Sequence, residues 1–150
     1  MADHKTIARY FISEAFSTGN LAPADEWIAP NFVNHDPGAP PLPAGPEGYK
    51  QLASGYRAAF PDLQITIDEP LAEGNKVAGR WTARGSNTGS LQGMPPTGKQ
   101  MIVSGTSILT FAGGKVAEHH TNWDTLGMLR QLGVIPRRGR AAVSQLPAHM

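Results

Sequence analysis

A polar strand is predicted near the end of the chain, with the sequence Lys115-Val116-Ala117-Glu118-His119-His120-Thr121-Asn122-Trp123-Asp124. Its even positions carry the polar side chains Glu118, His120, Asn122 and Asp124. Alternate side chains of a strand point the same way and lie about 6.5 Å apart, so these groups form one column. Facing solvent, such a column is only hydrated, but facing a cavity it forms an acid/base site. Two roles stay open for Asp124, because it also precedes a predicted helix and can cap it.

Other strands and helices are predicted upstream of this strand. Alternating or continuous apolar residues predict strands over residues 63–67, 77–83 and 101–111, and the last is apolar on both faces, as in a strand covered on both sides. Helical spacing predicts helices over residues 3–18, 23–28 and 46–60, and one after Asp124. This order indicates the α+β class, with helices on one face of a meandering antiparallel sheet and a pocket between the layers if the sheet is strongly bent.

The composition narrows the function classes. One domain is predicted over residues 1–136, followed by a basic tail, residues 137–150, that is loose or used in association. Thirteen Lys and Arg against twelve Asp and Glu give a net charge of +1, so nucleic acid is not a favoured partner. With no cysteine, and five histidines that lack zinc-type spacing, we expect no metal site and no cofactor. No apolar run approaches the roughly 20 residues of a membrane helix, so we expect a cytoplasmic protein without membrane contact.

A set of short motifs resembles the SnoaL-like polyketide (ester) cyclase family over about residues 5–135. The motifs, in order, are Asn34-His35-Asp36-Pro37, Gly45-Pro46-Glu47-Gly48, Phe60-Pro61-Asp62, Glu73-Gly74-Asn75-Lys76-Val77, Pro95-Pro96-Thr97-Gly98, Gly114-Lys115-Val116-Ala117-Glu118-His119, Trp123-Asp124 and Gln131-Leu132-Gly133. The resemblance implies the nuclear-transport-factor-2-like superfamily, with ketosteroid isomerase and limonene epoxide hydrolase as relatives. Its fold is a cone-shaped α+β barrel, in which N-terminal helices pack on a strongly curved, mostly antiparallel sheet and enclose a cavity.

The resemblance also implies a set of site residues. Asp124 would point into the cavity as the general acid/base of an intramolecular aldol condensation, with Asn122 and His120 on the same wall and His35 at the cavity mouth. The predicted catalytic residues are therefore Asp124 and His35. The predicted substrate-binding residues are His120, Asn122, Tyr10, Tyr49, Tyr56 and Arg80. One departure from the family pattern lies at Gly85-Ser86-Asn87-Thr88-Gly89, where Asn87 stands in place of a common histidine.

Several of these residues also fit a structural role. The tyrosines suit the core or the cavity wall, with hydroxyls available to a ligand. Arg80 could bind an acidic group, but arginines on a sheet are more often surface charges or dimer contacts. His35 could be a loop histidine, and His119 should point to the face opposite the predicted column, beside Trp123.

The favoured function is a cofactor-independent cyclase or isomerase acting on a medium-sized, apolar carbonyl compound. One alternative is epoxide hydrolysis of the limonene type, which would require Arg80 to reach Asp124 within about 3 Å. The other is a small-molecule binding or dimerisation module without turnover, since this fold serves unrelated tasks. In each case we expect a homodimer that forms through the outer face of the sheet.

Overall fold

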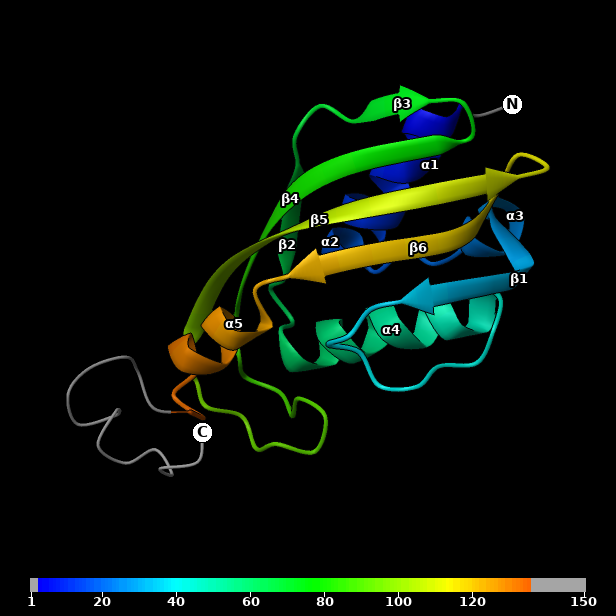
Figure 1. Ribbon diagram of the computed structural model, residues 1–150. Coiled ribbons are helices and arrows are strands. Elements are labelled where there is room, and N and C mark those ends of the chain that lie inside the picture. Colours follow the sequence, from blue (N-terminus) through cyan, green and yellow to red (C-terminus); the bar gives the residue numbers. More distant parts are fainter. Residues whose placement is uncertain (1–2, 136–150) are drawn as a thin grey trace, which may run out of the picture.

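The computed structural model describes residues 3–135, in which a curved sheet is backed by helices (Figure 1). The elements in chain order are α1 (His4–Arg9), the π-helical turn η1 (Tyr10–Glu14), α2 (Ala15–Thr18), α3 (Ala24–Trp27), β1 (Ile28–His35), α4 (Pro46–Ala59), β2 (Gln64–Ile67), β3 (Leu71–Glu73), β4 (Lys76–Ser86), β5 (Gln100–Ala112), β6 (Lys115–Trp123) and α5 (Thr125–Gln131). The predicted α+β class and cone-like curved sheet are confirmed.

The sheet has the strand order β1-β6-β5-β4-β2, and β3 pairs with β4. Strands β4, β5 and β6 form an antiparallel meander, whereas β1 lies parallel to β6, with His35 opposite His120. The sequence indicated only a brief extended run at Asn31–Pro37, because a parallel partner some 85 positions later leaves no local signal. Strand β1 therefore brings the residues around Asn34 next to the end of β6.

The N-terminal helical region is interrupted, although the sequence predicted one helix. The Asp3 side chain caps α1 by accepting a hydrogen bond from the backbone N–H of Thr6 at 2.8 Å, as predicted. The helical region then widens at η1 and ends at Gly19, whose φ of +77° is the left-handed conformation that glycine adopts readily. The π-helical turn places Phe11 and Ile12 against the sheet.

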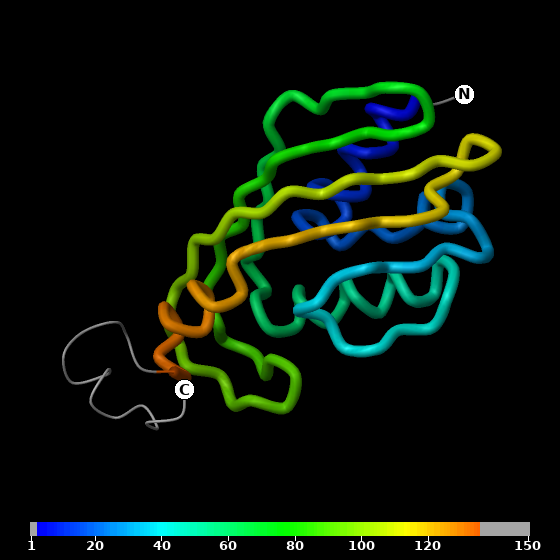
Figure 2. Tube along the Cα trace, in the orientation of Figure 1, coloured from blue at the N-terminus to red at the C-terminus, as the bar shows by residue number. Residues whose placement is uncertain are grey.

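Helix α4 begins at Pro46, as predicted, because a proline at the first helical position lacks only an N–H that would have no helical partner. It buries Tyr49, Leu52 and Ala53 and runs alongside β1, whereas α1 and α2 lie behind β4 and β5 (Figure 2). The ring of Phe11 packs on Tyr49 and Phe32 with centroid distances of 4.3 and 5.6 Å. Burying each such aromatic stabilises the fold by about 1.5–3 kcal/mol, so this cluster fixes the helices on the sheet.

The outer face of the sheet carries exposed apolar side chains. Ile102 and Ile108 of β5 are 59% and 41% exposed. The sequence predicted that this strand is covered on both faces, but residues 3–135 of one chain cover only the inner face. Helices within the described range are too short or too polar to cross a bilayer. The cytoplasmic location and the domain boundary stay predictions, and the tail at 137–150 lies outside the described residues.

Candidate active site

A β-bulge determines which side chains of β6 point toward the helices. Thr110 of β5 pairs with Glu118, but the next residue, Phe111, pairs with Val116, so Ala117 is an extra residue in β6. Val116 is buried before the bulge, and His119 and Thr121 are buried after it. The predicted column of His120, Asn122 and Asp124 therefore points away from the helices and is exposed, which corrects the expectation that it faces the cavity.

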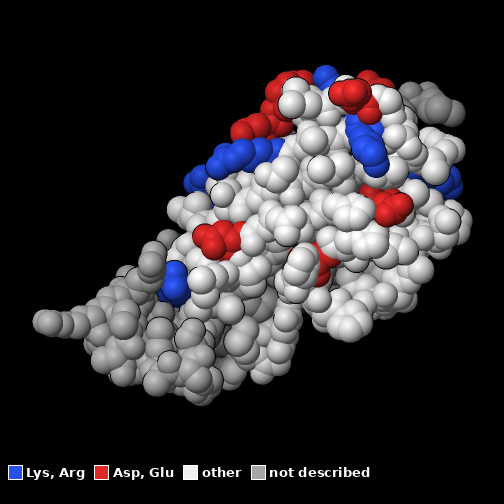
Figure 3. Space-filling view, in the orientation of Figure 1, with Lys and Arg blue, Asp and Glu red and all other residues white. Residues whose placement is uncertain are grey.

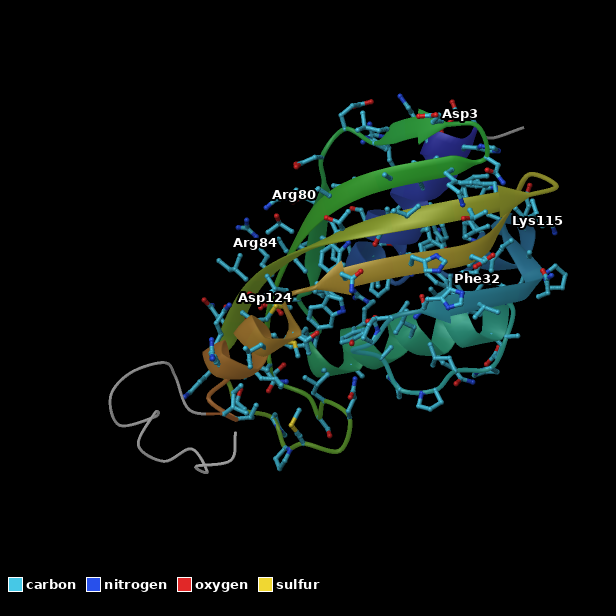
Figure 4. All side chains as sticks on the ribbon, in the orientation of Figure 1. Asp3, Phe32, Arg80, Arg84, Lys115 and Asp124 are labelled. Carbon is cyan, nitrogen blue, oxygen red and sulfur yellow. The ribbon has the colours of Figure 1, made fainter. Side chains whose placement is uncertain are left out.

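Asp124 lies at the junction of β6 and α5 (Figure 4). Its Oδ1 accepts a hydrogen bond from the backbone N–H of Gly127 at 2.8 Å, so it is the N-cap of α5. A Cβ at position 127 would lie 2.1 Å from Oδ2 of Asp124, and glycine there leaves room for the capping carboxylate. Of the two roles left open for Asp124, helix cap and cavity acid/base, the structure shows the cap. Asp124 does not line the cavity.

A cavity does lie between the inner face of the sheet and the helices. Its walls are mostly apolar and aromatic and include Phe16, Leu52, Phe60, Trp81, Met101 and Val103. The polar side chains that reach it are those of Asp36, Tyr56, Ser107, His119 and Thr121. The lining contains no lysine or arginine from the described residues, so a carboxyl group there is not neutralised by a protein cation.

Asp36, directly after β1, provides that carboxyl group. The indole N–H of Trp123 approaches both oxygens, at 3.3 and 3.4 Å, and the backbone N–H of Gly38 donates to Oδ1 at 2.8 Å. Burial raises the pKa of Asp36, and these two hydrogen bonds oppose that rise without cancelling it. The group is therefore a stronger base when ionised than an ordinary aspartate, and it is held in one orientation.

The hydroxyl of Tyr56 is the second notable group. It is buried and has no hydrogen-bond partner among residues 3–135. Burial first, and the negative charge of Asp36 second, raise the pKa of Tyr56, so the phenol keeps its proton. Its ring packs edge-on against Trp123 at a centroid distance of 6.1 Å. Trp123 thus contacts both groups, and the free phenolic O–H is available to donate to a bound molecule.

His119 forms the polar floor of the cavity. Its Nδ1 lies 2.6 Å from Oδ1 of Asn34 and its Nε2 lies 2.9 Å from Oγ of Ser107, which also accepts from the indole N–H of Trp81 at 3.0 Å. Burial lowers the pKa of His119 to about 3, so the ring is neutral at physiological pH. The hydroxyl of Ser107 donates to Oγ1 of Thr121 at 3.1 Å, so the ring belongs to a network of hydrogen-bonded side chains. As expected, His119 points to the face opposite the column, beside Trp123, but this face is the one that lines the cavity.

The structure brings few of the other predicted residues to the cavity. Tyr56 lines it, as predicted. The hydroxyl of Tyr10 instead donates to the carbonyl of Asn20 at 2.7 Å, and that of Tyr49 to the carbonyl of Phe11 at 2.5 Å, so both are used in the core.

His35 and Arg80 lie outside the cavity. His35 is on the outer face, with Nε2 3.2 Å from a carboxylate oxygen of Glu118. Arg80 extends from β4 into solvent, with its guanidinium 3.8 Å from Asp68, and Figure 4 shows it apart from Asp124. The arrangement that limonene-type epoxide hydrolysis would require is therefore missing.

Sequence reasoning missed Asp36 and His119. Asp36 follows an extended run within the Asn34-His35-Asp36-Pro37 motif, but the resemblance implied a site role only for the neighbouring His35. His119 was missed because the resemblance implied that the other side chains of β6, those of His120 and Asn122, line the cavity. Both residues reach the cavity because β1 and β6 pair in parallel, with Asn34 opposite His119.

The curved sheet with helices packed against one face is the ketosteroid isomerase-like fold. A protein described as having that fold, from Catenulispora acidiphila, superimposes with a TM-score of 0.71 at 14% identity, covering 88% of this chain and 95% of that one. TsrD from Streptomyces laurentii gives a TM-score of 0.78 at 26% identity, covering 90% and 100% of the two chains.

Sequence comparison places the chain more narrowly. The family model for SnoaL-like polyketide cyclase matches residues 6–132. The nogalonic acid methyl ester cyclase of Streptomyces nogalater is 31% identical over 121 residues, which span 79% of this chain and 90% of that enzyme. The chain belongs to the SnoaL-like polyketide cyclase family, and the resemblance inferred from its motifs is confirmed.

Proposed function

We propose that this protein is a cofactor-independent cyclase that closes a ring in a neutral, medium-sized carbonyl compound by an intramolecular aldol reaction, with Asp36 as the acid/base. The observation that carries the proposal is the pairing of Asp36, a carboxyl group whose pKa is raised in an apolar cavity, with Tyr56, whose hydroxyl has no partner among the described residues. Family membership supports the reaction class.

In the proposed reaction Asp36 acts first as the base and then as the acid, so the protons balance. Ionised Asp36 removes a proton from the carbon next to a substrate carbonyl, and the resulting enolate attacks a second carbonyl carbon of the same molecule. The O–H of Tyr56 donates to the oxygen on which negative charge develops. The protonated Asp36 then gives its proton to the new alkoxide, which becomes the hydroxyl of the product. Because Asp36 returns to its starting form, no cofactor is consumed.

The charge of the cavity favours an ester over a free acid. A carboxylate substrate would bring a second negative charge close to Asp36, in a lining without a described lysine or arginine to offset it. The related enzyme from Streptomyces nogalater is named for a methyl ester. We therefore propose a methyl ester of a polyketide acid, or a compound of similar polarity, as the substrate class.

Turnover of nogalonic acid methyl ester tests this proposal directly. The wild-type chain should convert the ester, and the corresponding free acid should react at least tenfold more slowly. Asp36→Asn, which keeps the shape of the side chain, should lower the rate by about 10²–10⁴-fold. If the wild type binds the ester without converting it, the protein is a binding module. If Asp36→Asn retains the full rate, another residue is the acid/base.

We also propose that the chain forms a homodimer through the outer face of the sheet. Figure 3 views this face and shows most of its Lys, Arg, Asp and Glu toward the β3 and β4 edge, which leaves much of the surface uncharged. Ile102 is exposed on it, six positions along β5 from the residue that pairs with His120. Light scattering should give a dimer for the wild type and a monomer for Ile102→Glu. A monomeric wild type would contradict this part of the proposal.

A further inference from the structure

Three potential metal ligands gather on the outer face of the sheet, away from the cavity. His35 of β1 lies directly opposite His120 of β6, and Glu118 lies two positions before His120, so all three side chains leave the same face. Their ligand atoms all lie within 4.8 Å of one another. The closest pair, Nε2 of His35 and Oε2 of Glu118, is 3.2 Å apart.

We propose that His35, Glu118 and His120 bind a divalent transition-metal ion, with Zn²⁺ as the reference ion and water in the open position. Zinc bound by imidazole nitrogen and carboxylate oxygen lies about 2.0–2.2 Å from each ligand, which places tetrahedral ligand atoms about 3.4 Å apart. The 3.2 Å contact already matches that spacing. Small rotations of the exposed side chains bring the remaining ligand atoms from within 4.8 Å to the same distance.

The two imidazoles lie side by side, and one of them has to turn for both to bind one ion. The rings of His35 and His120 lie 4.2 Å apart with an interplanar angle of 10°. An imidazole lone pair lies in the ring plane, so rotation of one of these exposed rings about its Cβ–Cγ bond brings both lone pairs toward a shared ion. Glu118 adds a negative charge that offsets part of the charge of the ion. An open depression beside the cluster, lined by His35, Pro37, His120 and Asn122, leaves room for water on the ion.

This site was not expected from the sequence, because the ligands come from two strands far apart in the chain. Glu118 and His120 alone give only two ligands on one strand. The third comes from the parallel pairing of β1 with β6. The inference does not rest on the proposed function, since Glu118 and His120 point away from the cavity that Asp36 and Tyr56 line.

Calorimetric titration of the full, EDTA-treated chain with ZnCl₂ tests the proposal. The wild type should bind one Zn²⁺ per chain, and Glu118→Gln and His120→Ala should each weaken binding at least tenfold. His4→Ala is the matched control, because it removes an imidazole that stacks on Phe111 at 4.0 Å and is not part of the cluster, and it should bind as the wild type does. Co²⁺ should give the visible absorption of a four-coordinate site in the wild type and not in Glu118→Gln.

Three results would overturn the proposal. They are the absence of Zn²⁺ binding by the wild type, wild-type affinity in both Glu118→Gln and His120→Ala, or one ion per two chains, which would indicate ligands from two copies. Circular dichroism shows whether each variant is folded. If His120→Ala does not fold, the more conservative change Glu118→Gln still tests the site. Glu118→Gln should also keep the wild-type rate of ring closure, so the metal-site proposal and the cyclase proposal are tested independently.

Discussion

The indole Nε1 of Trp123, the last residue of β6, lies 3.3 and 3.4 Å from the two carboxylate oxygens of Asp36, which directly follows β1. The two residues are 87 positions apart in the chain, and their contact links the ends of two parallel strands. It aims the carboxyl group into the cavity and moderates the rise in its pKa. Trp123 is therefore a positioning residue for the proposed acid/base.

Removing that donor should change the pH dependence of the reaction. Trp123→Phe keeps an aromatic ring beside Tyr56 but loses the N–H that stabilises ionised Asp36, so the pKa of Asp36 should rise further. The acidic limb of kcat/KM against pH should therefore move to higher pH. A profile that moves to lower pH, or stays in place, would show that the indole does not stabilise the ionised carboxyl group.

The hydroxyl of Tyr56 should matter for rate and not for stability. Because its oxygen is buried without a partner among residues 3–135, Tyr56→Phe removes an unsatisfied group and should leave the melting temperature unchanged or raise it. The loss of the donor to the developing oxyanion should lower kcat by about 10²-fold. Melting curves and saturation kinetics on the same preparations measure both effects. A clear loss of stability with normal kcat would make Tyr56 a structural residue.

Buried His119 should make the fold sensitive to acid. The pKa of its imidazole is about 3 in the folded chain and 6.5 in the reference state, so between these values the unfolded chain binds the proton and the folded chain does not. Its contribution to stability is therefore fully present above pH 6.5 and decreases as the pH falls toward 3, by up to about 1.4 kcal/mol per pH unit.

Two measurements check this pH dependence. Urea unfolding of the wild type and of His119→Gln should give a stability difference that becomes smaller as the pH falls through this window. Because His119→Gln also loses the contact with Asn34, an NMR titration of the wild-type ring is the second readout. It should show a neutral imidazole at about pH 5. A protonated ring at that pH would contradict the buried, neutral state.

Asn87, at the position where the family often has histidine, should contribute to stability rather than to catalysis. Its amide donates to the carbonyls of Ala59 and Gly89 at 3.3 and 2.9 Å and accepts from the N–H and O–H of Thr97, both at 2.9 Å. Asn87→Ala should lower the free energy of unfolding by about 2–4 kcal/mol, because buried backbone groups lose their partners. Exposed Asn122→Ala, the matched control, should change it by less than about 0.5 kcal/mol. Equal effects in denaturant unfolding would refute this role.

The order of elements could be predicted from sequence because it depends on local signals. Pro46 marks the start of α4, Asp3 caps the first helix, alternating residues mark β2 and β4, and a run that is apolar on both faces marks β5. The cavity wall depends on long-range geometry instead. The extra residue Ala117 reverses which side chains of β6 face inward. The parallel pairing of β1 with β6 determines that the loop after β1, which carries Asp36, lies next to the end of β6.

The error over Asp124 has the same origin. An aspartate before Thr125-Leu126-Gly127 is a good helix cap, and that local signal was correct. The role in the cavity came from the resemblance to the family, and it required the even positions of β6 to face inward. In the structure Asp36 provides the cavity carboxyl group instead, from a strand end at the other side of the parallel pair.

The measurement that tests this account most directly is a single-turnover comparison of Asp36→Asn and Asp124→Asn on nogalonic acid methyl ester. The two changes are chemically identical, and asparagine also caps helices well, so α5 should persist in Asp124→Asn. We predict that Asp36→Asn slows ring closure by about 10²–10⁴-fold and that Asp124→Asn stays within about threefold of the wild type. The reverse pattern, a slow Asp124→Asn and a fast Asp36→Asn, would contradict the assignment of Asp36 as the acid/base.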